Sequence, residues 1–253
     1  MAQETPQKPE EKKATEEKKP PEEKKVPEAT AEEPLPSVDQ ILEKNVDAVG
    51  GKAALEKITT REVKGVFEIP AMGASGTFTA WAKAPNKAAT TIDVPGFGVI
   101  QNAFDGTSAW EDNPMTGMRD LAGPELAARK RDSTFQRELK LKELYDKIEV
   151  KGRQKIGDKD VYVLEATPAE GKVEKLYFDV QSGLLVRLDA ERESPQGSAT
   201  VETSFENYKE VDGIKVPFAL KQVMPQFTIE LKFDEVKHNV EIEDAKFAKP
   251  ATQ

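Results

Sequence analysis

Apolar and polar residues alternate along most of the chain after residue 37, with the period of two that is typical of β-strands with one wetted face. The segment 227–233 gives the clearest alternation, with an apolar residue at every odd position. After this segment the apolar residues change from odd to even positions, beginning with Val236, and His238 also lies at an even position. One inserted residue near Asp234-Glu235 explains the slip and predicts a β-bulge or a strand break there.

Turn sequences separate the predicted strands. Asp-Gly pairs at 105–106 and 212–213 lie between apolar runs and are strong hairpin signals, and Pro95-Gly96 marks a further turn. The turns at Pro95-Gly96 and Asp105-Gly106 join three predicted strands, over residues 88–94, 97–104 and 107–111. The whole chain contains about ten or eleven such strands. No helix–strand alternation indicates a parallel sheet, so the sheet is expected to be antiparallel.

Two stretches have helical spacing instead. Ser37 is a plausible N-cap for a helix that Gly50-Gly51 ends. Residues 115–145 interrupt the strand pattern with leucines at helical spacing among charged residues, and predict helices over about 124–131 and 132–145. The fold class is therefore mainly β with helices (α+β): a curved antiparallel half-barrel whose concave face is covered by the N-terminal helix and by a helical lid at 115–145.

The first 36 residues have a different composition. Glu-Glu-Lys-Lys recurs at 10–13, 16–19 and 22–25, prolines are frequent, and large apolar residues are almost absent. Such a segment cannot bury enough apolar surface to offset its ordering entropy. We expect residues 1–36 to form a disordered Lys/Glu/Pro-rich tether in front of one domain that spans residues 37–253.

Composition excludes several classes of function. The net charge of −9 argues against a nucleic-acid partner, and no apolar run is long enough for a transmembrane segment. The chain has no cysteine and one histidine, His238, so a catalytic triad, a thiolate site or a multi-histidine metal site is not expected. We expect no cofactor, no metal and no enzymatic activity, with His238 as a structural or half-exposed residue of a strand. Met1-Ala2-Gln3-Glu4 is similar to a signal-peptidase junction, which predicts a periplasmic or otherwise extracytoplasmic protein with its signal peptide removed.

The candidate binding residues are apolar and lie on neighbouring strands or next to flexible backbone. Methionine adapts to irregular ligands, and three of the five methionines, Met72, Met115 and Met118, lie next to flexible backbone. The candidate ligand-binding residues are Phe67, Met72, Phe78, Phe97, Phe104, Trp110, Met115, Met118, Leu121 and Leu126. Two interpretations remain open: an ordinary core beneath a helix, or the mouth of an apolar ligand cavity gated by residues 115–131.

Several segments carry a resemblance to a known family. They are the helix that ends in Gly50-Gly51, the stretch Leu176-Tyr177-Phe178-Asp179 with the turn at Ser182-Gly183, and the run 208–217. Over about residues 37–249 the chain resembles the outer-membrane lipoprotein carrier and receptor superfamily (LolA/LolB-like, outer-membrane lipoprotein-sorting protein-like). The resemblance implies a half-open antiparallel barrel of about eleven strands, with a helical lid over a hydrophobic cavity that binds an acyl chain.

These observations lead to two functional hypotheses. The first is an exported domain that binds and carries a hydrophobic ligand, a lipid or a lipoprotein acyl chain, by burying its alkyl surface. The alternative is a tethered structural or accessory subunit of a bacterial envelope protein complex, with an envelope protein partner and no ligand cavity. A cavity of several hundred Å³ distinguishes the first from the second.

Overall fold

The computed structural model describes residues 34–194 and 197–251. The chain divides into two units, Met1–Pro34 and Leu35–Gln253, and the described structure belongs almost entirely to the second. The tether expected over residues 1–36 lies, up to residue 33, outside the described residues and stays a prediction.

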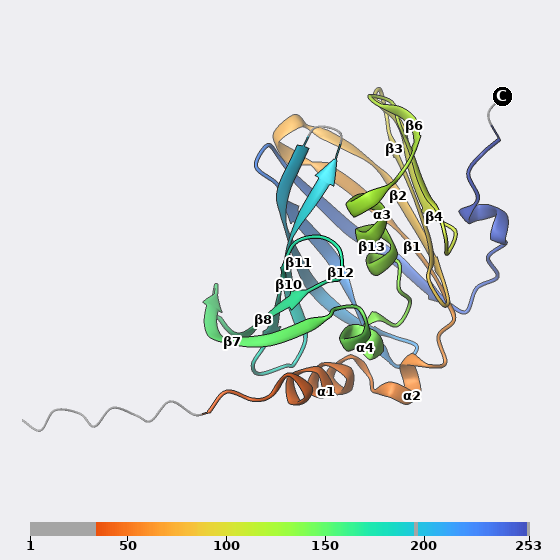
Figure 1. Cartoon of the computed structure of the whole chain (residues 1–253). Helices are drawn as coiled ribbons and strands as arrows, with labels where there is room; N and C mark the ends of the chain where they lie inside the picture. Colours follow the sequence, from red (N-terminus) through yellow and green to blue (C-terminus); the bar gives the residue numbers. More distant parts are fainter. Residues whose placement is uncertain (1–33, 195–196, 252–253) are drawn as a thin grey trace, which may run out of the picture. The chain divides into compact units, whose positions relative to one another are not determined.

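Within these residues, thirteen strands form one antiparallel sheet, which curves into an open half-barrel (Figure 1). The strands are β1 (Thr60–Ile69), β2 (Ala74–Lys83), β3 (Lys87–Val94), β4 (Gly98–Phe104), β5 (Ala109–Asn113), β6 (Gly117–Asp120), β7 (Lys147–Ile156), β8 (Lys159–Thr167), β9 (Glu174–Asp179), β10 (Leu185–Ser194), β11 (Gly197–Val211), β12 (Ile214–Val223) and β13 (Thr228–His238). Their order across the sheet is β6-β5-β4-β3-β2-β1-β13-β12-β11-β10-β9-β8-β7. The first and last strands therefore pair in the middle of the sheet, and β6 and β7, which follow each other in sequence, form its two edges.

The antiparallel half-barrel expected from the sequence is confirmed, with two or three more strands than expected. One addition is β6, which lies inside the stretch 115–145 that was predicted to be a helical insert. Residues 113–116 instead make a turn, closed by a hydrogen bond from the Thr116 amide to the Asn113 carbonyl, and return the chain alongside β5. The helical insert is therefore shorter at its start than the sequence predicts.

The predicted bulge on the last strand is confirmed. Lys64 on β1 pairs with Glu235 on β13, and the next residue, Gly65, pairs with Phe233, so Asp234 is the additional residue. A Cβ atom at position 65 would lie 2.0 Å from the Lys232 carbonyl oxygen, and this close approach of two backbones requires glycine.

The N-terminal helix α1 (Val38–Val49) also begins and ends where the sequence predicts. The Ser37 hydroxyl accepts from the Gln40 amide and the Gln40 side chain accepts from the Ser37 amide, which is a capping box. Gly50 ends the helix with a φ of 129°, and a Cβ atom there would lie 2.3 Å from the Gly213 carbonyl oxygen. The helix lies across one end of the sheet (Figure 1). It buries Ile41 and Leu42 against apolar side chains of β8, β9 and β10. A four-residue helix α2 (Lys52–Leu55) follows.

The insert contains helix α3 (Gly123–Asp132), close to the predicted 124–131, and then a much shorter helix than the predicted 132–145. Helix α4 covers only Arg137–Lys140, with a 3-10 turn over Leu141–Glu143. Gln136 interrupts the helix with a φ of 55°, because its amide nitrogen donates to the carbonyls of Leu55 and Ile58. These tertiary hydrogen bonds, together with the burial of Phe135, prevail over the local helical preference.

The main core lies on the concave face of the central strands, and smaller clusters lie around it. Phe67, Phe78 and Leu231 belong to the main core, and the rings of Phe78 and Phe233 stack with their centroids 5.7 Å apart. A separate cluster joins Trp110 to Phe247, which lies in the C-terminal 3-10 helix η3 (Asp244–Phe247) and is fully buried. The C-terminal segment is thus packed onto the sheet by an aromatic anchor.

Candidate functional site

The insert between β6 and β7 joins the two edges of the sheet. Because these strands are consecutive in the chain but lie at opposite ends of the strand order, the segment 121–146 must cross from one edge to the other. Figure 1 shows α3 between the two halves of the sheet, on its concave side, and α3 contacts β10. The insert therefore lies over the concave face, in the position of a lid.

A buried carboxylate holds the insert to the sheet. Glu174, at the start of β9, is only 1% exposed. Its carboxylate accepts from Arg131 of the insert at 2.9 Å, from Arg192 of β10 at 2.9 Å and from the Tyr145 hydroxyl at 2.5 Å. Burial alone would raise the pKa of Glu174, but the nearby Arg192, Tyr145 and Arg131 together lower this pKa to about 2. The group is therefore a charged carboxylate throughout the physiological pH range.

A second carboxylate extends this cluster. Asp132, at the end of α3, accepts from Arg137 at 3.1 Å and from Arg192 at 3.1 Å. Arg137 also donates to the Tyr145 hydroxyl and lies 3.6 Å from Glu174. We call this cluster the polar latch, and it consists of Arg131, Asp132, Arg137 and Tyr145 from the insert with Glu174 and Arg192 from the sheet. It connects the insert to the sheet through charges.

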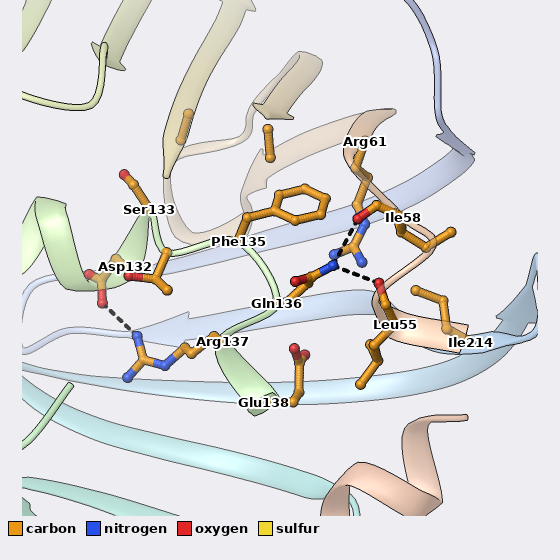
Figure 2. Close-up of a pocket in the computed structure, with 13 residues that line it drawn as sticks. Leu55, Ile58, Arg61, Asp132, Ser133, Phe135, Gln136, Arg137, Glu138 and Ile214 are labelled. Atoms are coloured by element: carbon orange, nitrogen blue, oxygen red, sulfur yellow. Dashed lines mark hydrogen bonds and ion pairs between the residues drawn. The ribbon is translucent and has the colours of Figure 1, made fainter. Parts of the chain in front are cut away.

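A partly enclosed cavity of about 220 Å³ lies beside the polar latch (Figure 2). Its apolar lining includes Leu55, Ile58, Phe135 and Ile214. Its polar lining consists of Arg61, Asp132, Ser133, Thr134, Gln136, Arg137 and Glu138. Larger spaces at the surface are open grooves: one of about 520 Å³ beside α3, one of about 710 Å³ between α1 and the segment 138–143, and one of about 390 Å³ beside Trp81 and η3.

Arg61 reaches this cavity from β1 and is held there by His238. The Arg61 Nε–H donates to Nε2 of His238 at 3.1 Å, and Nδ1 of the same ring lies 3.0 Å from an Asp212 oxygen. Burial and the neighbouring Arg61 lower the pKa of His238, while Asp212 opposes this shift. The neutral ring with its proton on Nδ1 satisfies both contacts, which fits the structural role expected for His238.

The ten predicted ligand-binding residues do not gather around one cavity. Phe67 and Phe78 lie in the main core, and Trp110 packs against Phe247. Phe104, Leu121 and Leu126 form a small cluster near α3, and Leu126 also lines the groove beside that helix. Met72, Phe97, Met115 and Met118 are exposed. None of the ten lines the cavity of about 220 Å³, and their role in ligand binding stays a prediction.

The four exposed residues of that set lie at the same end of the sheet. In an antiparallel meander the β1–β2, β3–β4 and β5–β6 turns share one end, and the pairing of β13 with β1 places the β12–β13 turn there too. Met72 is 65% exposed and Met115 is 72% exposed. The four turn regions contain no charged residue, in a chain of which 33% of the residues are charged. We call them the uncharged rim, and they span residues 69–74, 94–98, 113–118 and 223–228.

The sequence did not reveal the polar latch. Arg131 and Glu174 are 43 residues apart, so no spacing pattern connects them. A usable signal was present nonetheless, because Glu174 has the parity of Leu176 and Phe178 and therefore falls on the buried face of its strand. A carboxylate at such a position requires a cationic partner from another element.

Comparison with known proteins shows which fold the chain shares. No family model matches the sequence, and a search of curated proteins also found no match. A DUF1329 family protein from Desulfovibrio piger has a TM-score of 0.59 at 14% identity, covering 85% of this chain and 98% of that protein. A LolA superfamily protein from Nitrosomonas europaea has a TM-score of 0.57 at 14% identity, covering 85% and 99% of the two chains. The chain has a LolA-like fold.

An outer membrane lipoprotein-sorting protein domain from Vibrio parahaemolyticus is similar in the same way, with a TM-score of 0.57 at 16% identity, covering 83% of this chain and 96% of that one. The resemblance noted in the sequence is thus confirmed for the fold. Among the described helices, none is long and apolar enough to cross a membrane. The described residues also contain no group of three or more His, Asp or Glu side chains placed to hold a metal ion.

Proposed function

We propose that this protein is a non-enzymatic carrier that binds an apolar ligand, such as a lipid or a lipoprotein acyl chain, between the concave face of the sheet and the insert. The observation that carries the proposal is the way the insert is attached. Helix α3 contributes no fully buried side chain, and the polar latch connects its end to β9 and β10. The concave face of the central strands, by contrast, is apolar.

This arrangement suits a segment that has to open in water. Separating two apolar faces costs about 25 cal/mol for each Å² exposed. Separating buried charges returns them to water and recovers much of the desolvation penalty that their burial imposed. Helix α3, which is held mainly by charges, therefore opens at a lower cost than the segment that follows it, which buries Phe135 and Leu141. The apolar sheet remains available to a ligand.

Ligand binding requires this opening. Ligand pockets usually measure about 300–1,000 Å³, and the cavity beside the polar latch measures about 220 Å³. An acyl chain therefore enters this cavity only after the insert has moved. The likeness to a LolA superfamily protein and to a lipoprotein-sorting protein domain supports a carrier of this kind, located outside the cytoplasm.

The test uses an uncharged fluorescent probe, N-phenyl-1-naphthylamine, whose emission rises when it enters an apolar site. The native protein should bind this probe saturably, at about one molecule per chain. Glu174→Gln removes the central charge of the polar latch and should bind the probe faster. Asp244→Asn is the control, because Asp244 pairs with Lys83 and Lys87 at the surface. Absence of saturable binding to the native protein would contradict the proposal.

The uncharged rim favours a second candidate function, that of an accessory subunit that binds an envelope protein through an apolar contact. Scattered apolar side chains on a surface are ordinary, but a contiguous uncharged patch with exposed methionines is typical of an interaction site. Cross-linking in intact cells tests this function with Met72→Lys and Met115→Lys combined. Loss of a specific cross-linked protein supports it, and an unchanged cross-linking pattern contradicts it.

A further inference from the structure

Arg61 carries a positive charge that no acidic side chain in the described part of the chain pairs with directly. It lines the cavity of about 220 Å³, with its guanidinium carbon 5.8 Å from the centre of the Phe135 ring. Among the described residues it forms no ion pair, and its terminal Nη atoms have no hydrogen-bond partner. Burial lowers the pKa of Arg61, with a smaller opposing effect from Glu138. Arg61 is half-buried, and a guanidinium that is partly removed from water is stabilised by an accompanying anion.

The one group that Arg61 contacts cannot supply that anion. His238 accepts the Arg61 Nε–H with Nε2, so this nitrogen carries no proton and the ring is neutral. The opposite ring nitrogen lies 3.0 Å from Asp212, which is 60% exposed. The ring therefore fixes the direction of the guanidinium without neutralising it, and leaves the Nη atoms free to donate.

A second polar group on the same cavity also lacks a partner. Ser133 is 6% exposed, and its hydroxyl oxygen has no hydrogen-bond partner among the described residues. Figure 2 shows Ser133 and Arg61 on opposite sides of Phe135. Gln136 is already engaged, because its amide nitrogen donates to two backbone carbonyls. The cavity thus presents two unpaired groups that can donate hydrogen bonds, the Arg61 guanidinium and the Ser133 hydroxyl, beside the apolar side chains of Leu55 and Ile58.

We infer that this cavity binds an anionic group, a carboxylate or a phosphate, with Arg61 as its ion-pair partner. The inference rests on the proposed function and adds the class of the ligand: an amphiphile whose charged end lies at Arg61 and whose alkyl part lies along the apolar concave face. Arginine forms two parallel hydrogen bonds to such an oxyanion, which gives both strength and orientation.

The size of the cavity agrees with a head group. At about 30 Å³ for each water molecule, a volume of about 220 Å³ holds about seven waters. This is enough for a carboxylate or a phosphate with a few methylene groups, and the rest of an alkyl chain would extend under the opened insert. Glu138 also lines the cavity and is the one acidic side chain there outside the polar latch. Its negative charge weakens the preference of the cavity for anions.

The experiment compares four probes: dodecanoate, dodecyl phosphate, 1-dodecanol and inorganic phosphate. The two anionic amphiphiles are used below their micelle-forming concentrations, and 1-dodecanol below its solubility limit. Binding is measured by calorimetry and by displacement of N-phenyl-1-naphthylamine. The native protein should bind dodecanoate or dodecyl phosphate about tenfold or more tightly than dodecanol, as expected for a hydrogen bond to a charged group. Arg61→Gln should remove this difference and leave dodecanol binding unchanged. Lys64→Gln, on the same strand with an exposed side chain, is the control.

The outcomes separate the inference from the proposed function. If dodecanol and the fluorescent probe bind but the anionic probes bind no more tightly, the anion site is wrong and the carrier stands. If inorganic phosphate binds and Arg61→Gln abolishes its binding while no alkyl probe binds, the anion site stands for a free ion and the carrier is wrong. If no probe binds, both are wrong. Should Arg61→Gln fail to fold, Arg61→Lys and Ser133→Ala must each weaken dodecanoate relative to dodecanol, and equal losses would overturn the inference.

Discussion

Glu174 of β9 and Arg131 of α3 form an ion pair of 2.9 Å in which the carboxylate is 1% exposed and the guanidinium side chain 11% exposed. This pair connects the start of β9 to the segment that joins the two edges of the sheet. It also makes Glu174 the residue whose removal affects the attachment of the insert most directly, because Arg192 and Tyr145 bond to the same carboxylate.

Glu174→Gln should lower the free energy of unfolding by about 3–5 kcal/mol, because it leaves the buried Arg131 guanidinium without its counter-charge and leaves Arg192 with Asp132 alone. Urea denaturation followed by circular dichroism measures the change. The control Asp244→Asn should leave the midpoint nearly unchanged, since its ion pairs lie at the surface. Equal midpoints for the two variants would show that the polar latch contributes nothing.

The same variant should loosen the insert more than the sheet. The polar latch attaches α3 and the segment up to Tyr145, whereas β1 and β2 are joined by a continuous antiparallel ladder. Hydrogen exchange should therefore accelerate over residues 123–145 in Glu174→Gln and change little over residues 60–83. A uniform increase across both regions would indicate global destabilisation and contradict a local role for the latch.

The features of the fold that the sequence predicted are those that local residues determine. The capping box at Ser37 needs only the neighbouring Gln40, and the Asp212-Gly213 pair adopts positive φ at both positions of its turn without outside help. The bulge at Asp234 was visible as a change of parity along one strand. Each of these signals lies within a few residues of the structure that it specifies.

The features that the sequence did not predict depend on distant contacts. The helix over 132–145 was wrong because Gln136 bonds to the backbone of residues 55 and 58, which no helical spacing reveals. The candidate ligand residues were chosen as one set, but the fold distributes them between core clusters and the uncharged rim. The polar latch and Arg61 were missed because charged residues in a chain with 33% charge carry no individual signal.

Acidification should destabilise the protein from about pH 6.5 downward. The pKa of His238 is lowered in the folded state, chiefly by burial and also by Arg61, from an ordinary value of about 6.5. The unfolded chain therefore binds more protons than the folded one below pH 6.5, and the free energy of unfolding decreases as pH falls. This chain has one histidine, so urea midpoints between pH 7.5 and 5.5 report on His238. His238→Gln should flatten this profile, and an unchanged slope in that variant would refute the assignment.

Phe247→Ala should detach the C-terminal segment from the sheet. Phe247 is fully buried against Trp110, and its carbonyl accepts from the Trp110 indole at 3.4 Å. Removing a buried phenylalanine ring costs about 3–5 kcal/mol, and the loss should appear in thermal unfolding together with a red shift of tryptophan emission. Val99→Ala is the control, because Val99 is 43% exposed. A Phe247→Ala variant with the native melting temperature and emission would show that this anchor is dispensable.

Native mass spectrometry of the protein isolated from its own cells without detergent tests the central claim most directly. A carrier that holds an amphiphile under its insert should show, beside the mass of the polypeptide, an added mass of one or a few lipid molecules, which disappears on denaturation and is recovered by solvent extraction. The mass of the polypeptide alone, with no lipid in the extract and no mass added on incubation with dodecanoate or dodecanol, would contradict the claim.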